Sequence, residues 1–104
     1  MTSILMDYRG RNVRLTQERL AHVQDHPEMI GLEPLLSTAL RQPGVVIESP
    51  SDPTVLLYYH VLAEPRVGVK WMCVVVKYLE EDAFVLTAYL TDRPKKGRQL
   101  WPGM

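Results

Sequence analysis

The chain has 104 residues, 46% hydrophobic and 23% charged, a composition typical of one folded domain rather than of a disordered chain. Lys and Arg total 12 and Asp and Glu total 12, so no overall positive field exists to hold a polyanion, and a nucleic-acid partner needs a local basic patch. The single cysteine, Cys73, excludes an intrachain disulfide and a cysteine-based zinc site. No run approaches the ~20 apolar residues of a membrane span, so we expect a cytoplasmic protein without membrane contact.

The first strong pattern along the chain is an amphipathic helix over residues 16–25. Thr16 is a suitable N-cap, and Leu15 and Leu20 have the spacing of a hydrophobic staple. Pro27 limits the other end, because the residue before a proline is disfavoured in the helical conformation. We therefore expect this helix to begin at Thr16 and to end near residue 25.

Two of the three histidines of the chain, His22 and His26, lie on this helix at a spacing that places both on one face with Arg19. Imidazole is the side chain that ordinarily titrates near neutral pH, so the pair is a candidate for proton transfer or anion binding. The orientation of His26 stays open, since Pro27 places it at or beyond the helix end. The same pattern also occurs on ordinary protein surfaces.

A His-x-x-x-His pair on a helix is also a zinc-binding pattern. A third ligand would have to come from Asp25, Glu28 or the distant His60, and the glutamate of the zinc-protease motif is absent. We therefore expect no metal and no cofactor.

The remaining elements predict an α+β fold. A second helix is expected over residues 32–41, and strands rich in β-branched and aromatic residues are expected over 45–47, 55–62, 69–79 and 84–91. The connections between these strands, one of them the turn at 64–68, are too short for a helical crossover, which predicts an antiparallel meander. We expect two N-terminal helices packed on a four-stranded antiparallel sheet, with one domain over 1–92 and a basic, mobile C-terminal tail over 93–104.

The register of the last two strands determines whether three polar side chains gather. A three-residue hairpin loop at 81–83 would place Lys77 opposite Thr87, with Tyr89 two positions along. A two-residue loop would instead place Lys77 opposite Leu86. The sequence alone leaves both registers open.

Several segments between residues 13 and 89 carry a family resemblance. They are Arg14-Leu15-Thr16-Gln17-Glu18-Arg19, the run from His22 to Met29 with its His-Pro-Glu, residues 39–43, the Tyr58-Tyr59 strand, Val74-Val75-Val76-Lys77 and residues 84–89 with their Thr-Ala-Tyr. Together they resemble the phage-associated branch of the barnase, EndoU, colicin and RelE-like (BECR) nuclease superfamily. The resemblance implies N-terminal helices on a four-stranded antiparallel sheet. It also implies metal-independent RNA cleavage, often by a toxin or effector.

Cleavage of that kind needs a base for the ribose 2′-hydroxyl, cations for the phosphorane and an acid for the leaving 5′-oxygen. The resemblance implies catalytic roles for His22, His26, Lys77, Thr87 and Tyr89, and it does not say which is the base. Candidate substrate-binding residues are Arg19 and Lys70 for phosphate, and Tyr58, Tyr59 or Trp101 for base stacking.

Two hypotheses follow. The first is a ribonuclease of toxin or phage-effector type; the alternative is a non-catalytic module of the same fold that binds a protein, such as an antitoxin or immunity-like chain, through a sheet edge or the Trp101 tail. Zero net charge favours the second and the paired histidines favour the first. The discriminating observation is whether His22 or His26 lies within ~8 Å of Lys77 and Thr87, because acid, base and cations must surround one phosphate.

Overall fold

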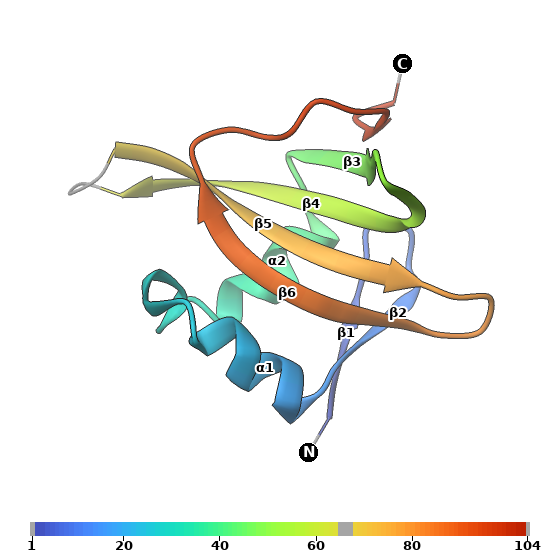
Figure 1. Ribbon diagram of the computed structural model, residues 1–104, viewed down its shortest axis with the longest axis horizontal. Helices are drawn as coiled ribbons and strands as arrows, with labels where there is room; N and C mark the ends of the chain where they lie inside the picture. Colours follow the sequence, from blue (N-terminus) through green and yellow to red (C-terminus); the bar gives the residue numbers. More distant parts are fainter. Residues whose placement is uncertain (1, 65–67, 104) are drawn as a thin grey trace.

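The computed structural model describes residues 2–64 and 68–103, and its main feature is a seven-stranded sheet with two short helices (Figure 1). In chain order the elements are β1 (Ser3–Met6), β2 (Asn12–Leu15), α1 (Gln17–Gln24), the single-turn 3₁₀ helix η1 (Pro27–Met29), α2 (Pro34–Arg41), β3 (Val45–Ser49), β4 (Asp52–Glu64), β5 (Gly68–Tyr78), β6 (Ala83–Thr91) and β7 (Gln99–Trp101). The turn predicted at 64–68 includes residues 65–67, which lie outside the described residues.

The strand order is β1-β2-β6-β5-β4-β3-β7, with every neighbouring pair antiparallel except β2 and β6, which are parallel at the single pair Arg14 and Phe84. The predicted architecture of two helices on a four-stranded antiparallel sheet is therefore wrong. The four expected strands form the middle of the sheet as β3 to β6, but β1, β2 and β7 extend it at both ends and make it mixed. These three strands have only three or four residues each, too few to show a period-two pattern.

The prediction for the first helix is confirmed. The Thr16 hydroxyl caps α1 by accepting a hydrogen bond from the backbone N–H of Arg19 at 3.1 Å, and Asp25 is the C-cap. His26 follows in an extended conformation, with φ −85° and ψ 108°, as expected for a residue before proline. The second helix begins at Pro34, which is tolerated in a first turn because its missing N–H has no helical partner there.

The sheet has a buried cluster on each face. The helix face is defined by Val23, Met29, Leu36 and Leu40 from the helices, packed with strand residues that include Val13, Tyr58, Met72, Val74, Val76, Val85 and Ala88. The opposite face, here named the tail face, is defined by Ile47, Val55, Leu57, Tyr59 and Cys73. Since α1 and α2 both contribute to the first cluster, they cover the same side of the sheet.

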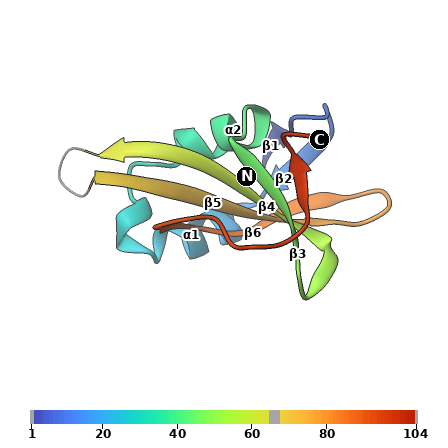
Figure 2. The ribbon, with the colours of Figure 1, turned by 90° about the horizontal axis from the view of Figure 1, so that it is seen from above.

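Residues 92–98 lie against the tail face, on the side of the sheet away from α2 (Figure 2). The backbone N–H of Lys95 donates to the Tyr59 hydroxyl at 3.1 Å, and a Cβ added at Gly97 would lie 2.8 Å from the Ile47 Cγ2 atom. Residues 99–101 then pair with β3 as β7. Residues 93–104 were expected to be a tail outside the domain. In the structure, the first part of this segment covers the tail face, and residues 99–101 add a strand to the sheet.

Neither predicted register of the last hairpin occurs. Lys77 pairs with Phe84, and a shift between Val75 and Val76 places Thr87 opposite Val75. This β-bulge leaves Leu86 without a partner residue on β5. A bulge changes which residues share a face, so alternation along the sequence could not reveal it.

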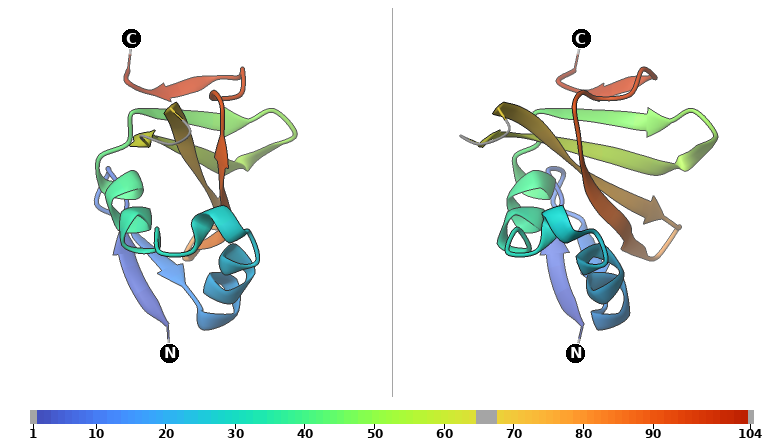
Figure 3. Two further views of the ribbon diagram at one scale, coloured as in Figure 1. Left: turned by 90° about the vertical axis from the view of Figure 1, so that its left-hand side faces the viewer. Right: turned by 60° about the vertical axis from the view of Figure 1, so that its left-hand side comes forward.

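The two ends of the strand order meet in space. Tyr8 lies in the loop after β1 and Trp101 in β7, yet their ring centroids are 5.7 Å apart. Figure 3 shows β7 and β3 side by side at one end of the molecule, with α2 and the loop after β1 below them. In the described part of the chain, no helix is long and apolar enough to cross a membrane.

Candidate functional site

The predicted histidines lie close together at the exposed side of α1. Their ring centroids are 6.2 Å apart, with the ring planes at 83°. His22 is exposed, and the side chain of His26 keeps 42% of its surface accessible, with its Nδ1 atom 3.8 Å from a carboxylate oxygen of Glu28. Val23, on the other side of the helix, is buried in the helix-face cluster. Both imidazoles are therefore open to a ligand from solvent.

Lys77 lies in a different environment. Its Nζ atom donates to the Asp52 carboxylate at 2.9 Å and to the Thr54 hydroxyl at 2.5 Å. Hydrogen bonds from the Thr54 and Lys77 side chains lower the pKa of Asp52 to about 2. Lys77 pairs with Val55 across the strands, which places it on the tail face, where its charge is already neutralised by Asp52.

Thr87 and Tyr89 also point to the tail face. Thr87 is opposite Val75, and Tyr89 is opposite Cys73 and packs on that cluster. Within the described residues, the Thr87 hydroxyl is buried without a hydrogen-bond partner, and burial raises the pKa of Tyr89. The expected Lys-Thr-Tyr group thus shares a face.

The two halves of the predicted catalytic site are on opposite sides of the sheet. His22 and His26 belong to α1 and its C-terminal boundary, and α1 packs on the helix face, whereas Lys77, Thr87 and Tyr89 point to the tail face. The structure therefore brings the two histidines together and, separately, places the three strand residues on one face of the sheet, at different positions along it. It does not bring the histidines to Lys77 and Thr87, so the condition set above for a nuclease site built from all five residues is not met, and this weakens the ribonuclease hypothesis.

The predicted substrate-binding residues are also dispersed. Arg19 lies on α1 near the histidines, while Lys70 on β5 forms an ion pair with Asp92. Tyr58 and Tyr59 are both fully buried, so neither ring is open to stack a base. Within the described ranges, no group of three or more His, Cys, Asp or Glu side chains is placed to hold a metal ion.

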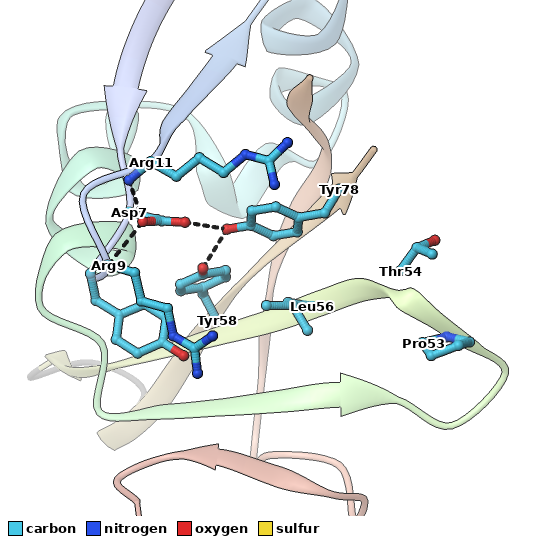
Figure 4. A pocket seen from close by; sticks show the side chains of 9 residues that line it. Asp7, Arg9, Arg11, Pro53, Thr54, Leu56, Tyr58 and Tyr78 are labelled. Atoms are coloured by element: carbon cyan, nitrogen blue, oxygen red, sulfur yellow. Dashed lines mark hydrogen bonds between the residues drawn. The ribbon is translucent and has the colours of Figure 1, made fainter. Parts of the chain in front are cut away.

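Sequence reasoning missed a pocket of about 300 Å³ between the β1–β2 loop and the strands β4 and β5 (Figure 4). Asp7, which is 5% exposed, accepts hydrogen bonds from the backbone N–H groups of Arg9 and Arg11, both at 2.9 Å. Its other oxygen accepts from the Tyr78 hydroxyl at 2.8 Å, and the Tyr78 and Tyr58 hydroxyls are 2.5 Å apart. This network links the N-terminal hairpin to the centre of the sheet.

Burial raises the pKa of both Tyr58 and Tyr78, so both hydroxyls stay protonated and can donate. With three donors, the Asp7 carboxylate has the partners that a buried carboxylate needs. The sequence feature that could have revealed this network is the turn-forming Asp-Tyr-Arg-Gly-Arg run, in which Gly10 adopts φ 85°. The network is better suited to holding the hairpin than to proton transfer, because every hydrogen bond in it is already made.

Comparison of the chain with protein-family models, with curated proteins and with solved structures finds no match. The resemblance to the BECR nucleases therefore stays a prediction from the sequence.

Proposed function

We propose that the protein is a metal-independent ribonuclease of toxin or phage-effector type, in which the ribose 2′-hydroxyl attacks the adjacent phosphate. The observation that carries the proposal is the pair of accessible imidazoles with ring centroids 6.2 Å apart. One imidazole takes the 2′-hydroxyl proton, and the other, in its protonated form, donates a proton to the leaving 5′-oxygen. The products are a 2′,3′-cyclic phosphate and a free 5′-hydroxyl.

A phosphate between the two rings also needs a cation, because negative charge accumulates on its oxygens in the transition state. Arg19 is three residues before His22, the spacing of neighbours on a helix surface. The proposal therefore relies on the α1 residues Arg19 and His22 together with His26. Lys77, Thr87 and Tyr89 have no role in it, because they lie on the opposite face of the sheet.

The test is incubation of purified protein with labelled RNA in EDTA. We expect cleavage to cyclic phosphate, and a His22→Ala/His26→Ala double variant should lose about 100-fold or more of the rate. His60→Ala, which removes the third histidine of the chain, is the matched control and should keep the wild-type rate. Intact RNA at high protein concentration, or full cleavage by the double variant, would reject the proposal.

Thr87→Val separates a site on α1 alone from one that includes the strands. The substitution keeps the side-chain shape and removes a buried hydroxyl that has no partner among the described residues, so folding should not suffer. Unchanged cleavage is expected for the α1 site. A loss comparable to that of the double variant would place the reaction on the strand residues instead.

A second candidate function is binding of a protein partner by strand addition. β1 lies at one end of the strand order, so its outer edge pairs with no other described strand. Its side chains Ile4 and Met6 are 57% and 48% exposed. An open edge with exposed apolar residues suits an added β-strand. This function is favoured if no RNA is cleaved and if Ile4→Lys abolishes binding of a co-purified partner while the fold is retained.

A further inference from the structure

The meeting of the two sheet ends creates a second hollow, a groove of about 410 Å³ lined by Tyr8, Arg41, Gln42, Pro43 and Trp101. These residues come from the loop after β1, the end of α2 and β7. The volume is within the ~300–1,000 Å³ that is usual for small-ligand sites. We name it the Tyr8–Trp101 groove.

The aromatic side chains of this groove are held in place but are not stacked on each other. The Trp101 indole N–H donates to the Pro43 carbonyl at 3.1 Å, which fixes the ring, and yet the residue is 43% exposed. Tyr8 packs edge-on against the buried Tyr58, with ring centroids 5.8 Å apart. The planes of Tyr8 and Trp101 are tilted by 56°. An indole with a fixed position and open surface is a preorganised stacking platform.

Polar and charged groups complete the groove. Arg41, in the last turn of α2, is exposed and has no salt bridge to any residue that the structure describes. The guanidinium of Arg9, which lines the neighbouring pocket and not this groove, lies over the Tyr8 ring, 5.2 Å from its centroid. A ligand that brings a planar ring to Trp101 and an anion to Arg41 would match the accessible groups of the groove.

We propose that the Tyr8–Trp101 groove binds one nucleotide of single-stranded RNA, with the base on the exposed surface of Trp101 and the phosphate at Arg41. Every base has a flat face that stacks on an aromatic ring, and an arginine binds phosphate by charge-assisted hydrogen bonds. The choice of RNA as the ligand rests on the proposed ribonuclease function. The groove is separate from the histidine pair and would hold the substrate rather than cleave it.

The experiment measures binding of a fluorescein-labelled, 2′-O-methylated single-stranded oligonucleotide by fluorescence anisotropy, since the methyl group prevents cleavage. Trp101→Ala should weaken binding by about 5- to 100-fold, the range found when a stacking ring is removed. Arg41→Gln should weaken binding several-fold and, because the Arg41 side chain is exposed, should fold normally. Lys96→Gln, in the separate basic cleft formed by Thr91, Arg93, Pro94, Lys95 and Lys96, is the matched charge control and should bind as wild type.

The binding measurements distinguish a wrong assignment of the groove from a wrong assignment of the catalytic site. Binding that is lost in Trp101→Ala and kept in the His22→Ala/His26→Ala variant supports the groove, whether or not RNA is cleaved. Binding that changes by less than about twofold in both Trp101→Ala and Arg41→Gln overturns it, since one stacked base alone accounts for more. An equal loss in Arg41→Gln and Lys96→Gln overturns it as well, because the attraction would then be nonspecific.

Discussion

Tyr78 has a central place at the scale of single residues, because its hydroxyl connects two other buried polar groups. It donates to Asp7 at 2.8 Å and lies 2.5 Å from the Tyr58 hydroxyl, so Tyr58 must donate to Tyr78. The Tyr58 hydroxyl only donates in this network, whereas the Tyr78 hydroxyl both accepts from Tyr58 and donates to Asp7. Removal of the Tyr78 hydroxyl should therefore lower the free energy of unfolding more than removal of the Tyr58 hydroxyl.

We expect Tyr78→Phe to lower the free energy of unfolding by about 1–3 kcal/mol, because it leaves a buried Asp7 oxygen without its donor. Tyr58→Phe removes a single neutral hydrogen bond and leaves Asp7 satisfied, so about 0.5–1.5 kcal/mol is expected. Urea unfolding of the two variants, which lose the same atom from the same residue type, measures the difference. Equal losses would show that the hydroxyls do not form a directed chain ending at Asp7.

At the scale of elements, residues 92–98 act as a cover for the tail face, and Gly97 is where backbone and sheet come closest. A Cβ at position 97 would lie 2.8 Å from the Ile47 Cγ2 atom and 3.1 Å from the Glu48 carbonyl oxygen. Ile47 is 4% exposed and has little room to move. The close approach requires glycine.

Gly97→Ala should therefore destabilise the protein by about 1–3 kcal/mol, the usual cost of adding a carbon atom to a packed site. Gly103→Ala is the matched control, because nothing lies within 4 Å of a Cβ built there. Thermal unfolding of both variants gives the comparison. If both keep the wild-type midpoint, residues 92–98 do not pack on the sheet in solution.

Local sequence patterns predicted most helices and the long strands. The short strands and the way the sheet ends come together depend on contacts between residues distant in sequence. The ends of α1 were predictable because Thr16 and Pro27 act within one turn of the chain. β7 was missed because three residues acquire a strand conformation only through pairing with β3. For the candidate sites, helix periodicity predicts the exposed position of His22, whereas His26 lies beyond the helix end in an extended conformation and still comes close to His22. The contact of Tyr8 with Trp101 instead depends on the curvature of the whole sheet.

At the scale of the whole molecule, the charge balance restricts how RNA can be held. The formal net charge is +0, so attraction to phosphate comes from local cations and not from an overall field. The cations near the proposed contacts are Arg19 beside the histidines, Arg41 in the groove, and Arg9, which lies over the Tyr8 ring and lines the neighbouring pocket. Four further cations, Arg93, Lys95, Lys96 and Arg98, lie in the C-terminal segment and have no place in either proposal.

The salt dependence of RNA binding separates these two sets of cations. Each phosphate contact with a single strand contributes about −0.7 to the slope of log K against log salt, so two or three contacts predict a slope of about −1.5 to −2. Arg41→Gln should reduce the magnitude of that slope by about 0.7, while Lys96→Gln should leave it unchanged. The measurement is the affinity for the methylated oligonucleotide from about 50 to about 300 mM KCl, a range in which counterion release dominates the change. A slope of about −4 or steeper would require more phosphate contacts than Arg9, Arg19 and Arg41 can make, and the C-terminal cations would then belong to the RNA-binding surface.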